Sequence, residues 1–176
     1  MVAIVESLTR EIDGAWAKAD YDKDRFSEIA LRSLNQSLDL DFSALARLVS
    51  SGLELPQQRR LDQGFGQPAL TLYHGERFVV EALCWHTGSP AIHQHAFSGA
   101  FRVATGRSVH ARYSFTEHER LETRVSLGTL ELKGVDLLDV GMVTEIPRGR
   151  GLIHSTFHLD NPSMTIIVRS HDEYEP

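Results

Sequence analysis

The chain has a single cysteine, Cys84, among its 176 residues. One thiol excludes an internal disulfide and fits the reducing cytoplasm, and its place in an apolar run predicts burial in the core. No apolar run approaches the roughly 20 residues that a membrane-spanning helix needs, and the first residues lack the basic flank of a secretory signal. We therefore expect a soluble, cytoplasmic protein without a membrane partner.

Positive charge is also scarce. The sequence has 24 acidic against 18 basic residues, which gives a formal net charge of −6. A protein that binds nucleic acid by neutralising phosphates needs the opposite balance, and no block of basic residues interleaved with aromatics is present. The composition therefore argues against a nucleic-acid partner, and we expect a small-molecule substrate instead.

Apolar residues in the first 52 positions recur at the spacing of helix faces. Three stripes follow one another: Val5, Leu8, Ile12 and Trp16; then Phe26, Ile29, Ala30, Leu34 and Leu38; then Phe42, Leu45, Leu48 and Val49. The third has Asp41 or Ser43 as its N-cap and Gly52 as its C-terminal stop. We expect a helical region over residues 1–55 that packs through these stripes.

The pattern becomes strand-like from Ala69 to Ser170. Short runs rich in Val, Ile, Leu, Phe and Tyr alternate with turn residues, among them Gly106, Gly128, Gly134 and Gly141. Such spacing, without intervening helices, is typical of an antiparallel sandwich or barrel and predicts roughly eight to ten strands. We expect one domain over residues 1–176, mainly β, with the helical region packed on an antiparallel β-barrel over residues 69–171.

His93 and His95 stand two residues apart between apolar stretches. On a strand such residues share a face, and neutral imidazole is the commonest protein ligand for divalent transition metals. An isolated pair of this kind is more often two exposed loop histidines. A second histidine-bearing segment follows about 60 residues later and contains His154 and His158. The two segments together predict a metal site if the barrel brings them close.

The order of these residues resembles the two motifs of the cupin superfamily, which forms antiparallel jelly-roll barrels. The first motif is partly matched by Gly88, His93, His95 and Gly106, and the second by Gly141, Pro147, Gly149 and His154. The glutamate ligand of the first motif would fall on Gly99 or Ala100 and is missing. In the second motif the histidine position falls on Leu152, two residues before His154. Because cupins commonly pair, the resemblance also implies a homodimer.

Within that superfamily the sequence resembles the cysteine dioxygenase-like thiol dioxygenases, which hold their metal with three histidines. The matching stretches are Leu83-Cys84-Trp85, Ile92-His93-Gln94-His95 and His158-Leu159-Asp160-Asn161-Pro162-Ser163. The last stretch offers His158 in place of His154 as the third ligand, and both remain open. The resemblance implies Fe(II), whereas ligand chemistry alone also admits Zn, Ni, Cu or Mn.

The sequence departs from that family at the substrate site. Residues 69–73 supply no arginine for a substrate carboxylate, and the cysteine that some members cross-link to tyrosine is replaced by Ala100. We therefore do not expect cysteine to be the substrate. The reaction expected from the resemblance is an iron-dependent dioxygenation of another small organic molecule. The alternatives are a ligand-binding cupin without activity and a non-oxidative isomerase or lyase.

Five other residues are candidates for a polar role. If the polar members of the alternating segment 109–114 face the interior, His110 is a fourth ligand or a substrate contact. Guanidinium groups bind carboxylates, so the candidate anion anchors are Arg102, Arg112 and Arg169. Glu145 is a candidate acid or base, as is His110.

Overall fold

The computed structural model describes residues 2–36, 40–52, 54–58, 66–86, 91–123, 125–148 and 151–171. Its helical elements are α1 (Val2–Ala17), the short 3-10 helix η1 (Lys23–Arg25), α2 (Phe26–Leu34) and α3 (Phe42–Ser50). Its strands are β1 (Ala69–His74), β2 (Phe78–Trp85), β3 (Gly99–Thr105), β4 (Ser108–Glu122), β5 (Val125–Leu138), β6 (Val143–Ile146), β7 (Ile153–His158) and β8 (Ser163–Ser170). None of the helices in these ranges is long and apolar enough to cross a membrane.

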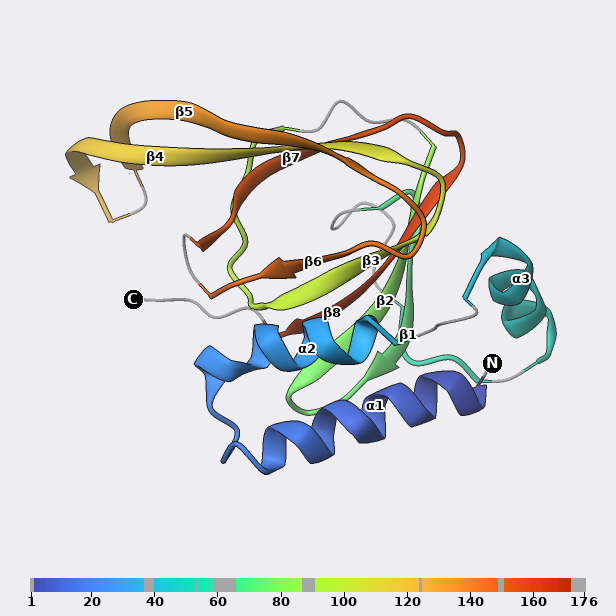
Figure 1. Ribbon diagram of the computed structural model, residues 1–176. Coiled ribbons are helices and arrows are strands. Elements are labelled where there is room, and N and C mark those ends of the chain that lie inside the picture. Colours follow the sequence, from blue (N-terminus) through green and yellow to red (C-terminus); the bar gives the residue numbers. More distant parts are fainter. Residues whose placement is uncertain are drawn as a thin grey trace.

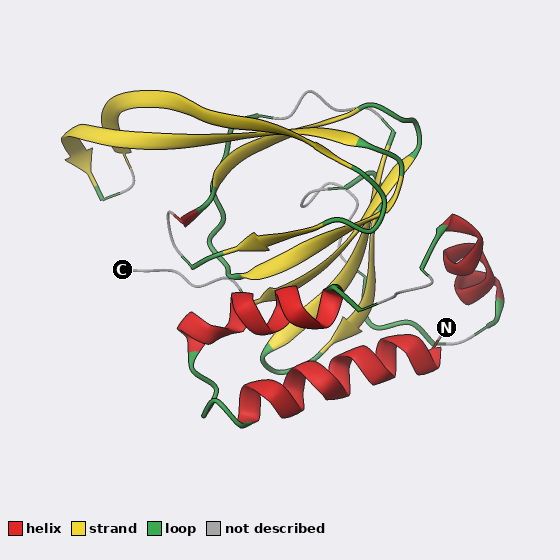
Figure 2. Cartoon of the chain, viewed as in Figure 1, coloured by secondary structure: helices red, strands yellow, loops and turns green. Residues whose placement is uncertain are grey.

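Two antiparallel sheets form the body of the molecule. One has the strand order β1-β2-β8-β3-β6 and the other the order β5-β4-β7. The helices α1 and α2 lie along one side of the five-stranded sheet, and the three-stranded sheet lies on its other side (Figures 1 and 2). The predicted fold class, a mainly β antiparallel jelly roll with an N-terminal helical region, is confirmed. Within the described residues the two sheets remain separate, so the roll is open and is not a barrel closed by hydrogen bonds.

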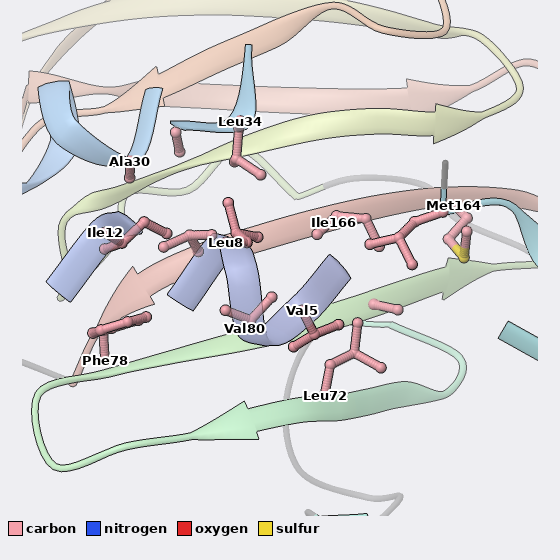
Figure 3. Close-up of a cluster of buried hydrophobic side chains, with 14 of the residues drawn as sticks. Val5, Leu8, Ile12, Ala30, Leu34, Leu72, Phe78, Val80, Met164 and Ile166 are labelled. Atoms are coloured by element: carbon pink, nitrogen blue, oxygen red, sulfur yellow. The ribbon is translucent and has the colours of Figure 1, made fainter. Parts of the chain in front are cut away.

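The helices α1 and α2 pack on the five-stranded sheet through the predicted stripes. In the third stripe both leucines are buried, but Val49 is 56% exposed, so its predicted packing role is wrong. All four residues of the first stripe are buried, in one cluster with residues of α2, β2 and β8 (Figure 3). Ile12 has no exposed surface. The turn that follows α1 is fixed by Trp16, whose Nε1 donates a hydrogen bond to the carbonyl oxygen of Asp22 at 2.8 Å.

The strands β2 and β8 are buried on both faces, which explains why β2 is almost continuously apolar and why the centre of β8, Ile166 to Val168, is apolar. One face of each strand meets the helices, and the other faces the three-stranded sheet. Both sets of alternating side chains are therefore removed from water and contribute to the hydrophobic effect. Cys84 lies in the helix-facing cluster with 5% of its surface exposed, and burial raises the pKa of its thiol. Its predicted core position is confirmed.

The predicted ends of α3 are also confirmed. Of the two candidate N-caps the structure uses Asp41, whose side chain accepts a hydrogen bond from the backbone N–H of Ala44 at 2.6 Å. Gly52 follows the helix with φ +70°, the left-handed conformation that favours glycine after a helix. Leu38 of the second stripe lies outside the described residues, as do Gly88 and Gly149 of the motif matches.

The hairpin of β4 and β5 is longer than the sequence predicts. Gly128 and Gly134 were expected to end strands, but both lie inside the 14-residue β5. A Cβ at Gly128 would lie 2.6 Å from the ring of Phe115, so the glycine makes room for that ring on the neighbouring strand. The register shifts on β5 beside Gly134, which is typical of a β-bulge. The far end of the hairpin extends beyond the other strands in Figure 1.

Replacing Ile12 with alanine tests the contact between helix and sheet. The substitution leaves a cavity where α1 meets the sheet, and we expect it to lower the free energy of unfolding by about 2–5 kcal/mol. Urea denaturation measures the change. Asp13→Ala, on the exposed side of the same helix, is the control and should change stability by less than about 0.5 kcal/mol. Equal stability of the two variants would contradict the packing described here.

Candidate metal centre

The two histidine segments meet where the chain between β2 and β3 runs beside β7. His93 and His154 form an antiparallel bridge in which each backbone N–H donates to the other residue's carbonyl oxygen at 2.9 Å. His93 and His95 lie outside the named strands, contrary to the expectation of a regular strand. The bridge supplies the extended backbone that a strand would have given, and it holds the segment against β7.

His93, His95 and His154 form a cluster able to hold a metal ion. One ring nitrogen from each lies within 4.8 Å of the others. The Nε2 atoms of His95 and His154 are 2.9 Å apart. A metal about 2.1 Å from each of two neighbouring ligands at a right angle separates those ligands by roughly 3 Å, so this spacing fits a shared ion. Among the described residues, no carboxylate or thiolate joins this group.

Hydrogen bonds fix which nitrogen of two of these rings faces the cluster. His93 Nδ1 lies 2.8 Å from the carbonyl oxygen of Ala91. A carbonyl oxygen only accepts hydrogen bonds, so Nδ1 of His93 carries the proton and Nε2 is the ring nitrogen with the lone pair that a metal would need. His154 Nδ1 lies 2.8 Å from Nε2 of His110, which leaves His154 Nε2 directed at His95. Such outer hydrogen bonds orient histidine ligands in metalloproteins.

His110 therefore lies behind the cluster, in contact with His154. It is 2% exposed, and burial, followed by the nearby charge of Arg112, lowers the pKa of its imidazole. A neutral His110 can accept the proton of His154 Nδ1 through its own Nε2. The sequence offered a role as a fourth ligand or as a substrate contact. The structure places His110 where it would position the third ligand.

Two imidazoles of the cluster, those of His95 and His154, stay neutral at physiological pH. Burial, with a smaller repulsion from His93, lowers the pKa of His95 to about 4. Burial, with repulsion from the neighbouring imidazoles, lowers the pKa of His154 to about 2. Burial disfavours the charged form of histidine, and a metal requires the neutral form. The rings of His95 and His154 are therefore in the protonation state that a metal ion requires.

His158 lies apart from the three clustered histidines. Its Nδ1 is 2.9 Å from Oγ of Ser108, and its ring stacks on Trp85 with a centroid distance of 4.6 Å and an interplanar angle of 19°. Burial lowers its pKa to about 4. Of the two third ligands that the sequence left open, the structure brings His154 into the cluster and gives His158 other partners.

The other candidate residues have partners away from the cluster. Arg102 Nη1 donates to the carbonyl oxygen of Leu34 on α2 at 2.9 Å. Arg112 forms an ion pair of 2.8 Å with Asp136, and each side chain is about half exposed.

Arg169 and Glu145 are engaged in the same way. The Nε atom of Arg169 lies 3.0 Å from a carboxylate oxygen of Glu81, and both side chains are buried. Glu145 accepts a hydrogen bond of 2.8 Å from Oγ of Ser27, which ties β6 to α2. None of these four residues joins the group of potential metal ligands.

Two aromatic rings that sequence reasoning missed flank the cluster. Phe97 lies beside His95 with a centroid distance of 4.6 Å, and Phe101 lies beside His154 at 6.2 Å. Phe97 follows His95 by two residues, so the alternation that placed His93 and His95 together could have extended to it. Phe101 comes from β3 of the opposite sheet, and only the three-dimensional fold reveals it. These rings give the site an apolar wall.

Comparison with known proteins gives partial likenesses of fold. No protein-family model and no curated protein matches the chain. A protein of Bacillus halodurans is 15% identical over 61% of this chain and 72% of its own, with a TM-score of 0.43. Hydroquinone 1,2-dioxygenase from Sphingomonas sp. TTNP3, with 4-hydroxybenzoate bound, is 11% identical over 63% of this chain and 70% of its own, with a TM-score of 0.45.

A third similar structure is the formate complex of oxalate decarboxylase from Lactobacillus farciminis. It is 14% identical, with a TM-score of 0.41, and the match covers 66% of this chain and 31% of that one. The chain thus corresponds to about a third of the decarboxylase. Fold and site together define the class: a jelly-roll protein with a candidate three-histidine metal centre.

Replacing His110 with alanine removes the partner of His154 Nδ1. We expect the affinity for Co(II) or Zn(II) to fall by about 10- to 100-fold, the usual effect of losing such an outer hydrogen bond. Competition with a chromophoric chelator measures the affinity. His118→Ala, an exposed histidine on the same strand, is the matched control and should bind metal normally. Unchanged affinity in His110→Ala would show that His154 needs no positioning.

The stability of the metal-free protein should fall as the pH is lowered from about 7 to about 5. Unfolding returns His95 and His154 to the ordinary pKa of 6.5, whereas the folded values are about 4 and 2. The unfolded chain therefore binds more protons below pH 6.5, and acid favours it. Urea unfolding at several pH values measures the slope, and His95→Ala should reduce it. A stability that rises toward pH 5 would contradict these pKa values.

Proposed function

We propose that the protein is a cupin-type, mononuclear non-haem iron dioxygenase that acts on a small organic molecule. The observation that carries the proposal is the convergence of His93, His95 and His154, each of which brings one ring nitrogen within 4.8 Å of the others. The resemblance of the sequence to thiol dioxygenases supports Fe(II) over Zn, Ni, Cu or Mn. We also propose a cytoplasmic location, in keeping with the lone buried thiol of Cys84.

The charge of the ligand set narrows the substrate class. Three neutral imidazoles add no negative charge, so a divalent ion keeps its full charge in this site. Three protein ligands also leave coordination positions open. A bound metal would supply there a place for a substrate and dioxygen to meet. A site of this charge favours a substrate that binds as an anion, such as a carboxylate, an enolate or a phenolate.

The side chains around the cluster support this assignment. Phe97 and Phe101 limit the access of water to the rings beside them, which strengthens electrostatic interactions within the site. His110 holds the ring of His154. Because Arg112 and Arg169 are paired with carboxylates, the metal is the group best placed to bind an anionic substrate.

Oxidation is favoured over isomerisation or elimination by the state of the two candidate bases. An isomerase or a lyase needs a base that is free to take a proton from its substrate. His110 is hydrogen-bonded to His154, and Glu145 to Ser27. A ligand-binding role without catalysis makes a different prediction, which the following experiment separates from dioxygenation.

The test is to load the purified protein anaerobically with Fe(II), measure bound iron, and follow oxygen uptake with a panel of thiols, small carboxylic acids and phenols. We expect about one iron per chain and uptake that depends on one class of compound. His95→Ala should weaken iron binding by at least about tenfold, because a ligand is lost. His158→Ala is the matched control, since it removes another histidine of lowered pKa, and it should retain iron.

Three outcomes decide the matter. Full retention of iron by both His93→Ala and His95→Ala would remove the metal site from the proposal. Loss of iron in His158→Ala together with retention in His154→Ala would transfer the third ligand to His158. Iron binding without oxygen uptake by any compound of the panel would favour the ligand-binding role.

A further inference from the structure

The connection that leads into β3 changes character at Ser98. Residues 91–97 are each exposed or half-buried, whereas Ser98, Gly99 and Ala100 are buried. Ser98 is fixed to the end of β8, because its N–H donates to Oγ of Ser170 at 3.1 Å and its carbonyl oxygen accepts from the N–H of Ser170 at 2.8 Å. We call residues 91–97 the strap. It ends at this fixed point, where β3 begins (Figure 1).

The strap and β4 hold opposite edges of β7 with different strength. The strap meets β7 at the isolated bridge of His93 and His154, whereas β4 pairs with β7 over six consecutive residue pairs. Successive N–H groups of a strand point to opposite edges, so the N–H of His154 reaches the strap and that of Ser155 points to β4. A segment with few buried side chains and solvent-exposed hydrogen bonds opens locally at low cost. The strap is therefore the weaker attachment.

The inner side of the strap consists of rings. His93, His95 and Phe97 alternate along the extended chain and face the site. The ring centroids of His93 and His154 are 4.6 Å apart, and those of His95 and Phe97 are also 4.6 Å apart. Two of the three candidate ligands thus lie on the strap, and the third lies on β7. A bound ion would join the strap to β7 across the same boundary as the isolated bridge.

A hydrogen bond lies between two of the candidate ligands when the strap is closed. The Nε2 atoms of His95 and His154 are 2.9 Å apart, and such a contact needs a hydrogen on one nitrogen and a lone pair on the other. A metal needs a lone pair from each ring. This hydrogen bond must therefore break before both rings can bind one ion, and withdrawal of the strap breaks it.

We propose that the strap opens and closes about Ser98 as a gate for the metal, and that a bound metal ion holds it closed. Opening separates His93 and His95 from His154 and lets an ion reach the three rings. Ligation then favours the closed form, since a ligand that binds one conformation stabilises it by mass action. The inference rests on the metal site of the proposed function and not on the reaction.

Hydrogen exchange at two adjacent backbone amides tests the proposal. In the metal-free, isotope-labelled protein, NMR should show the amide of His154 exchanging at least about tenfold faster than that of Ser155, after correction for intrinsic rates. The amide of His93 should exchange like that of His154, because one opening exposes both. One equivalent of Zn(II) should slow His93 and His154 by at least about tenfold and leave Ser155 within about twofold. Equilibrium dialysis measures the bound Zn(II).

Two variants locate the effect. His95→Ala removes a ligand of the strap but keeps the backbone bridge, so Zn(II) should no longer slow exchange at His93 and His154. His158→Ala is the matched control and should respond like the wild type. Circular dichroism checks that both variants fold, and the wild-type comparison decides the matter if one does not.

The outcomes distinguish the strap from the metal site. Zn(II) that binds without slowing exchange at His93 and His154 overturns the strap and leaves the metal site intact. Metal-free exchange at His154 as slow as at Ser155 also overturns the strap, because the segment then does not open. A chain that binds no Zn(II) overturns both the strap and the metal site on which the proposed function rests.

Discussion

Two backbone hydrogen bonds between His93 and His154 are the constraint on which the candidate site depends. They join a segment that belongs to no named strand to β7, and so bring together His95 and His154, which are 59 residues apart in the sequence. Once the backbones are paired, the direction of each ring follows from its neighbours. The carbonyl of Ala91 orients one imidazole and His110 another. The candidate metal ligands are therefore held by main-chain pairing first and by side-chain contacts second, which limits the ordering that a metal would have to impose.

The strands β4 and β7 serve two different environments. Their inner side chains include His110 and His154, which lie against Phe101 of the opposite sheet. Their outer side chains are mostly apolar and half-buried, and Phe157 is 51% exposed. Strict alternation along a strand lets one pair of strands carry a polar centre on one face and an apolar surface on the other. The five-stranded sheet differs, because helices cover its second face. Buried apolar side chains therefore lie on both of its faces.

The sequence predicts those parts of the fold that local pattern controls. The first two helical stripes, the Asp41 cap and the stop at Gly52 all follow from spacing and from residue type, and each is found within the described residues. The third stripe is found in part, because Val49 is exposed. The length of β5 could not be predicted, because glycine in a sequence usually indicates a turn. Only the structure shows that Gly128 lies inside a strand, where the ring of Phe115 fills the space that a side chain would need. The choice between His154 and His158 stayed open at the level of sequence for a similar reason. Four residues apart on one strand they share a face, and only pairing with His93 places one of them at the centre.

The packing around His95 shows how a site of neutral ligands can lie beside a buried charge. Arg169 is placed 5.2 Å above the ring of Phe97, which in turn lies against His95. An unpaired guanidinium there would repel a metal cation and would cost several kcal/mol of desolvation. Its ion pair with Glu81 cancels the net charge and offsets part of the desolvation cost. The pair thus lies behind Phe97 while adding no net charge, and a divalent ion would be the dominant charge of the site when bound. The exposed pair of Arg112 and Asp136 balances its own charge on the neighbouring sheet in the same way.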